Sequence, residues 1–150
     1  MLEILVAAIA IGADQLTKWI VETHMRLWES INVIGGILSF TYVKNTGAGF
    51  SFLNGYPDLV EWIVAFVVLA LVIFSVWWKE KSHFFELSTG LIIGGALSNM
   101  LSRLINGGAV TDFIRLPYWP VFNVADSCVV AGAVGLGIYF LKREEKCGKN

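Results

Sequence analysis

The sequence has little charge, and this excludes most soluble proteins. Asp, Glu, Lys and Arg make up 15% of the 150 residues, whereas 56% are apolar, and the mean hydropathy is +0.67. Eleven basic residues are balanced by twelve acidic ones, which leaves a net charge of −1 and no basic excess for binding nucleic acid. These features predict a small integral membrane protein with no nucleic-acid partner.

Cysteine and histidine are also scarce, with two of each in the chain. Cys128 falls in a predicted membrane span and Cys147 in the C-terminal tail, so we expect no disulfide between them. His24 and His83 are predicted on opposite sides of the membrane, too far apart to share a zinc ion. We therefore expect neither a metal ion nor another cofactor.

Four stretches of low charge predict four membrane-spanning helices. Three of them contain uncharged runs close to the length that crosses a bilayer. The N-terminal stretch resembles a cleaved signal peptide at Ala8–Ala10, but its start is not basic, which favours a span. The expected fold is a mainly α-helical, single membrane domain over residues 1–150, with spans at about 2–21, 60–78, 86–104 and 124–141.

Lys and Arg predict how the chain crosses the membrane, because short cytoplasmic loops are enriched in them. Segments 79–86 and 142–150 hold six of these residues, whereas the longer segments 21–60 and 104–125 hold three. Both termini are therefore predicted in the cytoplasm, and both longer loops are predicted outside.

The two outer loops differ in character. The first is predicted to form a small antiparallel sheet over residues of about 30–55, because segment 37–43 is rich in β-branched and aromatic residues and lies between glycines. The second, between the third and fourth spans, is expected to form turns and irregular chain. Its Tyr118 and Trp119 suit the membrane interface.

Small residues four apart predict close contacts between helices. They occur on the last two predicted spans. The pairs are Gly90 and Gly94 on the third span, and Ala131 with Gly135 and Ala133 with Gly137 on the fourth.

Placing a polar side chain inside the membrane costs free energy, so each such residue is expected to have a structural or a functional role. Six of them form pairs three or four residues apart, on one face of a helix: Asp14 and Lys18, Asn99 and Arg103, Asn123 and Asp126. For each pair a structural and a functional role are open. The structural roles are an ion pair within the first helix, an arginine that reaches the interface, and a cap at the start of the fourth helix.

Two aspartates suggest a sharper hypothesis. Asp112 lies in the second outer loop and Asp126 at the start of the fourth span. Two carboxylates held close together cannot both ionise easily, so one keeps a proton while the other activates water, which is the chemistry of an aspartic protease. The alternatives are a charge-relay transporter, which needs polar groups through the depth of the membrane, and a non-catalytic scaffold, which leaves both aspartates without a purpose.

Five segments resemble, in order and spacing, the bacterial lipoprotein signal peptidases, or signal peptidase II. They are Asp14–Lys18, Lys44–Ser51, Gly94–Arg103, Val110–Ile114 and Phe122–Ser127. The resemblance extends over residues of about 10–140. It implies an aspartyl endopeptidase of the membrane that cleaves prolipoproteins just before a cysteine carrying diacylglycerol.

The resemblance also assigns roles to residues. Asp112 and Asp126 match the catalytic pair. The residues that match the surrounding polar groups, for substrate binding or support of the site, are Asp14, Lys18, Asn45, Asn99, Arg103 and Asn123. In the family, the sheet cradles the substrate and a short helix in the second outer loop closes over it. The chain departs from the family pattern at Ser98 and Ser102, where Gly and Asp are usual, so Arg103 lacks one acidic partner.

The implied setting is the bacterial cytoplasmic, or inner, membrane. The protein is expected to cross it several times, with both termini in the cytoplasm and the active site near the outer leaflet. The expected partners are lipid-modified prolipoproteins and membrane lipid. We expect a monomer that needs no cofactor.

Overall fold

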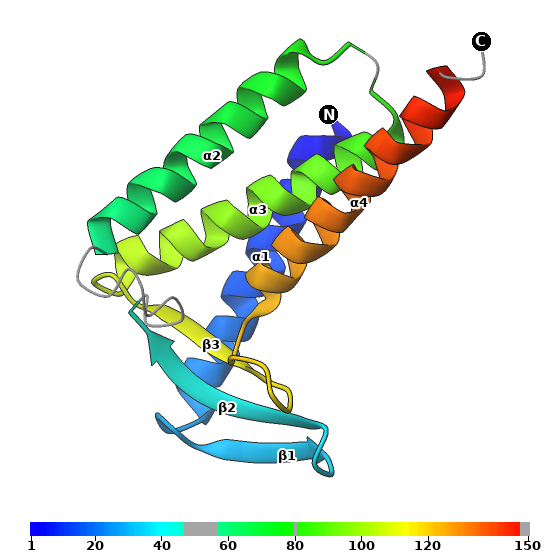
Figure 1. The fold of residues 1–150 in the computed structure, drawn as a ribbon. Helices are drawn as coiled ribbons and strands as arrows, with labels where there is room; N and C mark the ends of the chain where they lie inside the picture. Colours follow the sequence, from blue (N-terminus) through cyan, green and yellow to red (C-terminus); the bar gives the residue numbers. More distant parts are fainter. Residues whose placement is uncertain (47–56, 80, 148–150) are drawn as a thin grey trace.

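The computed structural model of the protein describes residues 1–46, 57–79 and 81–147, except for the side chains of 57–62, 64 and 145–147. Within these ranges four helices form a bundle, and a three-stranded sheet lies at one end of it (Figure 1). The helices are α1 (Leu2–His24), α2 (Pro57–Trp77), α3 (His83–Ile105) and α4 (Val124–Cys147), and the strands are β1 (Ser30–Ile34), β2 (Leu38–Asn45) and β3 (Val110–Arg115). Both chain ends lie away from the sheet (Figure 1).

The helices carry apolar side chains outward and several polar ones inward, as helices in lipid do. Ile9 and Phe66 are 62% and 72% exposed, whereas the carboxylate-bearing Asp14 is 0% exposed. Among the described residues, α1, α3 and residues Val124–Glu144 of α4 are long and apolar enough to span a membrane. The chain is therefore a multi-pass membrane protein with three candidate spans. The described apolar part of α2, Ala65–Trp77, is shorter, so the second of the four predicted spans, at about 60–78, stays a prediction.

Glycines on α3 and α4 let the helices approach closely. A Cβ atom at Gly90 would lie 2.6 Å from the backbone oxygen of Glu3, and one at Gly94 would lie 2.7 Å from that of Ala7, so the predicted contact of this pair is confirmed against α1. On α4, Gly135 approaches Ser88, but among the described residues nothing lies within 4 Å of a Cβ atom placed at Gly137, so the contact predicted at Gly137 is not found.

Substituting alanine for Gly94 should therefore destabilise the bundle. One added methyl group would press on the backbone of α1, at a cost of about 1–3 kcal/mol for overpacking. Gly137→Ala is the matched control, because the same methyl group meets open space there and raises helix propensity. Thermal unfolding of both variants in one detergent measures the difference. Equal midpoints would contradict this account of α1–α3 packing.

The sheet has the order β1-β2-β3, and both neighbouring pairs are antiparallel. Its first two strands come from the first outer loop, which confirms the predicted sheet for the described part of residues 30–55; residues 47–55 lie outside the described ranges. The register of β2 with β3 joins Val43 to Asp112 and Asn45 to Val110. Asn45 and Asp112 are therefore near neighbours across the sheet.

The second outer loop differs from its prediction. Residues Val110–Arg115 form β3 instead of irregular chain. Residues 106–123, which are all described, contain no helix, so of the predicted loop or short helix the structure has the loop. The physical reason is the free edge of β2: its unpaired backbone groups accept a third strand, and the β-branched and aromatic residues of 110–115 suit that position.

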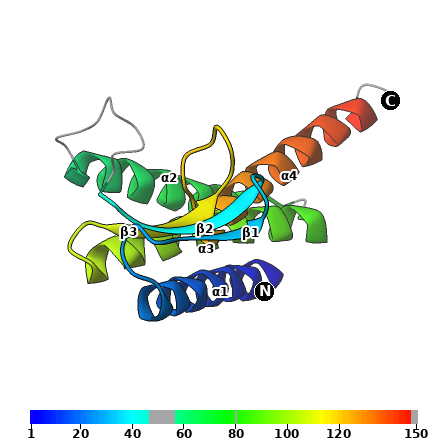
Figure 2. The same cartoon turned by 90° about the horizontal axis from the view of Figure 1, so that it is seen from below.

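The sheet packs on the end of α1. Val21 of α1, Tyr42 of β2 and Phe113 of β3 form its buried apolar cluster. Lys44 Nζ lies 2.7 Å from Glu22 Oε1 of α1, and the Thr111 hydroxyl donates to the same carboxylate oxygen. Seen from below, α1 lies on one side of the sheet, and the chain that leaves β3 arches over the other side (Figure 2). These contacts fix β3, and with it Asp112, relative to the helices.

Candidate functional site

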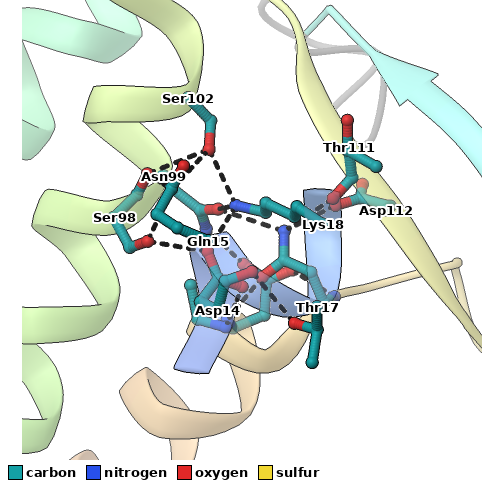
Figure 3. A network of polar contacts seen from close by, with 12 residues as sticks. Asp14, Gln15, Thr17, Lys18, Ser98, Asn99, Ser102, Thr111 and Asp112 are labelled. Atoms are coloured by element: carbon teal, nitrogen blue, oxygen red, sulfur yellow. Dashed lines mark hydrogen bonds and ion pairs between the residues drawn. The ribbon is translucent and has the colours of Figure 1, made fainter. Parts of the chain in front are cut away.

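A buried ion pair on α1 forms the base of the site. Asp14 and Lys18 lie one helical turn apart, and Asp14 Oδ2 is 2.6 Å from Lys18 Nζ, with side chains 0% and 4% exposed. Asp14 Oδ1 also accepts the backbone N–H of Ala125 in the first turn of α4 at 2.8 Å. Asp14 thus joins α1 to the start of α4 (Figure 3).

Lys18 supports other site residues. Besides Asp14 Oδ2, its ammonium donates to Asn99 Oδ1 at 2.8 Å and to Ser102 Oγ at 3.0 Å. An ammonium has three N–H donors, so these three acceptors occupy all of them. These contacts fit the supporting part of the role predicted for Lys18, because they fix the orientation of the Asn99 amide. A direct part of Lys18 in substrate binding stays a prediction.

The start of α4 is held by a reciprocal cap. Asn123 Oδ1 accepts the backbone N–H of Asp126 at 2.9 Å, and Asp126 Oδ2 accepts the backbone N–H of Asn123 at 3.1 Å. This pattern is that of a capping box, with Asp in place of Glu. The cap and a functional role are therefore compatible, because the cap fixes the position of the Asp126 carboxylate.

Asp112 reaches the site from β3 and is only 3% exposed. Its Oδ1 accepts from Asn123 Nδ2 at 2.7 Å and its Oδ2 from Asn45 Nδ2 at 2.9 Å. The pKa of Asp112 is raised from 3.8 to about 6, mainly by burial and also by the charge of Asp126, while the hydrogen bonds from Asn45 and Asn123 and the charge of Lys18 oppose the rise. Asp112 therefore keeps its proton up to a pH of about 6, well above the pH at which an ordinary aspartate loses it.

Asn99 connects the two aspartates. Its Nδ2 donates to Asp126 Oδ1 at 2.8 Å, and its Oδ1 accepts from Asn123 Nδ2 at 3.0 Å. Because Asn123 Nδ2 also donates to Asp112, the two carboxylates are joined through two amides. The strand β3 and the helix α4 that follows it thus bring Asp112 and Asp126 into one polar network.

Arg103 lies outside this network. It is half-buried near the C-terminal end of α3. Among the described residues no carboxylate forms an ion pair with it. Of the eight site residues predicted from the sequence, the structure joins seven in this network, and within the described part of the chain the Arg103 guanidinium has no hydrogen bond or ion pair.

Three further residues belong to the network and were not among those predicted. They are Gln15, next to Asp14, and Ser98 and Ser102, one turn apart on α3 (Figure 3). The sequence signal for the serines was their departure from the family pattern. The signal for Gln15 was its place beside the ion pair.

The described side chains do not gather into a metal site. No group of three or more His, Cys, Asp or Glu residues among them could hold a metal ion. Cys128 is a free thiol, and the side chain of Cys147 lies outside the described set.

Comparison with known proteins gives one consistent result. The family described as signal peptidase (SPase) II matches residues 6–142. The chain is 43% identical to a lipoprotein signal peptidase of Halothermothrix orenii, over 96% of this chain and 97% of the relative, and 42% identical to one of Symbiobacterium thermophilum, over 94% and 93%. A solved structure described as a bacterial membrane enzyme has a TM-score of 0.85 and 32% identity, covering 96% of this chain and 90% of its own.

The fold and the site together define a multi-pass membrane protein in which two carboxylates share a buried amide network. With the matches described above, the chain belongs to the signal peptidase II family, a family of peptidases. The resemblance seen in the sequence motifs is therefore confirmed.

Proposed function

We propose that the protein is an aspartyl endopeptidase that removes the signal peptide from diacylglyceryl-modified prolipoproteins, cleaving just before the lipidated cysteine. The observation that carries this proposal is the joining of Asp112 and Asp126 through Asn123 and Asn99. Relatives over nearly the whole chain are named lipoprotein signal peptidases, which supports the substrate class.

In the proposed reaction, one aspartate of the pair is ionised and the other is protonated. The ionised carboxylate takes a proton from a water molecule as that water attacks the scissile carbonyl, and the protonated carboxyl donates a hydrogen bond to the carbonyl oxygen. Collapse of the tetrahedral intermediate releases the amine of the cysteine, which receives a proton. The shared proton belongs to the pair, so neither aspartate is assigned it permanently.

The amide groups keep both carboxylates in place for this reaction. Each carboxylate accepts two N–H donors: Asp112 from Asn45 and Asn123, and Asp126 from Asn99 and the backbone of Asn123. Because these donors are already in place, the site does not have to reorganise when charge develops in the transition state. They also favour the ionised form of one carboxylate, which the pair needs as its base.

The membrane and the sheet supply the proposed substrate path. Acyl chains of the substrate stay in lipid beside the apolar helix surfaces, at about 0.8 kcal/mol per buried CH₂, so the peptide itself needs little affinity. A cavity of about 520 Å³ lies between the β1–β2 hairpin and the chain after β3, with Asn32, Ser39, Arg115 and Trp119 in its lining. We assign the extended peptide to this sheet and a substrate carbonyl to Arg103.

The proposed orientation puts both termini in the cytoplasm and the site near the outer leaflet of the bacterial cytoplasmic membrane. It rests on the excess of Lys and Arg in segments 79–86 and 142–150. The described parts of both segments lie at the end of the bundle away from the sheet (Figure 1). One chain holds both aspartates, so we propose a monomeric enzyme without a cofactor.

Cleavage of a purified prolipoprotein tests the proposal. The substrate is offered to the protein in detergent in two forms, with and without diacylglycerol on the cysteine, and the products are identified by mass spectrometry. We expect a single cut before the cysteine in the lipidated form only. Equal cleavage of both forms would contradict the lipid requirement, and no cleavage of either would contradict the function.

The pH dependence gives a second prediction. The monoprotonated pair is lost as pH rises through the pKa of Asp112, about 6, so kcat/KM should fall on the alkaline side. Because the Asn45 hydrogen bond lowers that pKa, Asn45→Ala should raise it, and the proton should persist to higher pH. We expect the alkaline limb of the pH profile, which is the fall of kcat/KM at high pH, to move up by about one pH unit. Asn106→Ala, outside the network, should leave the limb in place; a downward shift for Asn45→Ala would contradict the assignment.

A further inference from the structure

Behind the ion pair lies a second layer of polar contacts between α1 and α3. Ser98 and Ser102 are 0% and 1% exposed, and Gln15 is half-buried beside them (Figure 3). Gln15 Nε2 lies 3.0 Å from the backbone oxygen of Ser98, 2.8 Å from Ser98 Oγ and 3.0 Å from Ser102 Oγ. The amide of Gln15 thus crosses from α1 to both serines on α3.

Each serine also forms a hydrogen bond with one member of the ion pair. Ser98 Oγ donates to Asp14 Oδ2 at 2.7 Å. Ser102 Oγ accepts from Lys18 Nζ at 3.0 Å and donates to the backbone oxygen of Ser98 at 3.0 Å. No buried side-chain polar atom among the described residues lacks a hydrogen-bond partner, so the layer is fully satisfied.

The ion pair in turn holds Asp126 from two directions. Asp14 Oδ1 accepts the N–H of Ala125, the residue before Asp126. Lys18 Nζ binds Asn99 Oδ1, which turns the amide nitrogen of Asn99 toward Asp126. A shift of Asp14 would move the backbone next to Asp126, and a shift of Lys18 would move the Asn99 amide that binds the Asp126 carboxylate.

We infer that Gln15, Ser98 and Ser102 form a clamp of positioning residues, which holds Asp14 and Lys18 in the geometry that aims the Asp126 carboxylate at the substrate. This inference deepens the proposed function and rests on it. The clamp touches no reacting atom; it acts through the ion pair and Asn99. Its loss should therefore lower kcat and leave KM nearly unchanged, because substrate contacts stay in place.

The absence of charge in the clamp is also part of its role. Two charged groups contact it directly, Asp14 and Lys18. The charges of Glu22 and Asp112 interact with that of Lys18, Lys44 pairs with Glu22, Asp126 is linked to Lys18 through Asn99, and Arg103 is the residue after Ser102. Position 102 is neutral, so Lys18 is matched by one carboxylate, Asp14. A second carboxylate at position 102 would add negative charge close to the aspartate pair, and the shared proton would be released at higher pH.

Two single variants test the clamp, with a matched control on the same helix. Ser98→Ala and Ser102→Ala each remove one hydroxyl from it. Ser88→Ala removes an equally buried hydroxyl, which donates to the backbone oxygen of Phe84 on its own helix and lies outside the site. We expect kcat to fall at least about tenfold for each clamp variant, KM to change less than about twofold, and Ser88→Ala to match the wild type. Size-exclusion profiles establish that all variants are folded.

The pH profile of Ser102→Asp separates positioning from simple packing. We expect its alkaline limb to move up by about half a pH unit or more, whereas a purely structural change would lower activity without moving the limb. Ser102→Asn, similar in shape and neutral, is the control and should leave the limb in place.

The outcomes distinguish the inference from the function on which it rests. If Asp126→Asn is inactive while Ser98→Ala and Ser102→Ala behave like Ser88→Ala, the clamp is wrong and the function stands. If Asp126→Asn cleaves lipidated precursor as fast as the wild type, both are wrong. A limb that stays fixed in Ser102→Asp overturns the charge role of position 102.

Discussion

Replacing Asp126 by asparagine should lower the turnover of lipidated precursor by at least about three orders of magnitude, as loss of a group that takes part in proton transfer does in other proteases. An amide cannot accept the proton of the attacking water. It still accepts from Asn99 through one oxygen, so most of the network around it remains. Asp112→Asn should have an effect of similar size, because each carboxylate is half of one acid–base unit.

The control for these variants is Glu29→Gln. Glu29 also accepts a backbone N–H, that of Arg26 at 2.7 Å, but it lies in an exposed turn before β1. The same loss of one carboxylate there should change turnover less than about twofold. Turnover is measured with lipidated precursor at matched amounts of folded protein. Activity within tenfold of the wild type in either Asp variant would remove that aspartate from the catalytic pair.

Replacing Lys18 by methionine should cost about 3–5 kcal/mol of unfolding free energy, because it leaves the Asp14 carboxylate buried without its counter-charge. The Asn99 amide would also lose one of the two donors that fix its orientation, so turnover should fall as well. Thermal unfolding in detergent and turnover, measured on one preparation, give both quantities.

A second ion pair in the same chain provides the comparison. Lys44 and Glu22 lie 2.7 Å apart, much as Lys18 and Asp14 do, but their side chains are 28% and 31% exposed. Water screens such a pair, so Lys44→Met should cost less than about 1 kcal/mol. The double variant Asp14→Asn, Lys18→Met should recover part of the stability lost in Lys18→Met but not the turnover. Equal losses for Lys18→Met and Lys44→Met would show that burial does not govern the two pairs.

The helices could be predicted from sequence because each is a long apolar run, and such runs admit few alternatives. The third strand could not. Residues Val110–Arg115 are six residues with an aspartate among them, and their extended form depends on the free edge of β2, which no local pattern reveals. The same contact determines where Asp112 lies.

The site was predictable where a single helix carries the spacing. Asp14 with Lys18, and Asn123 with Asp126, are three or four residues apart, and both pairs are in contact as the helical period requires. The joining of Asp112 with Asp126 depends on a sheet and a helix together; the sequence offered it as one hypothesis among alternatives, and the family motifs favoured it. Ser98, Ser102 and Gln15 were missed because uncharged polar residues on a membrane helix commonly bond to their own backbone.

The burial of Lys18 also changes how the site is understood. A lysine in the same polar network as the two aspartates suggests a role in binding substrate. Its three donors are all occupied by protein atoms, which fits an internal counter-charge, and we propose Arg103 as the cation that meets the substrate. This distinction depends on distances that a sequence does not contain.

Single-turnover cleavage in ¹⁸O-labelled water tests the central claim most directly, namely that the aspartate pair activates water for direct attack on the peptide. Enzyme in excess over lipidated precursor cuts each substrate once, and mass spectrometry reads the new carboxylate of the released signal peptide. Direct attack predicts one ¹⁸O atom in that carboxylate from the first turnover. An unlabelled carboxylate would mean that an enzyme oxygen had been transferred through a covalent intermediate, and it would contradict the mechanism.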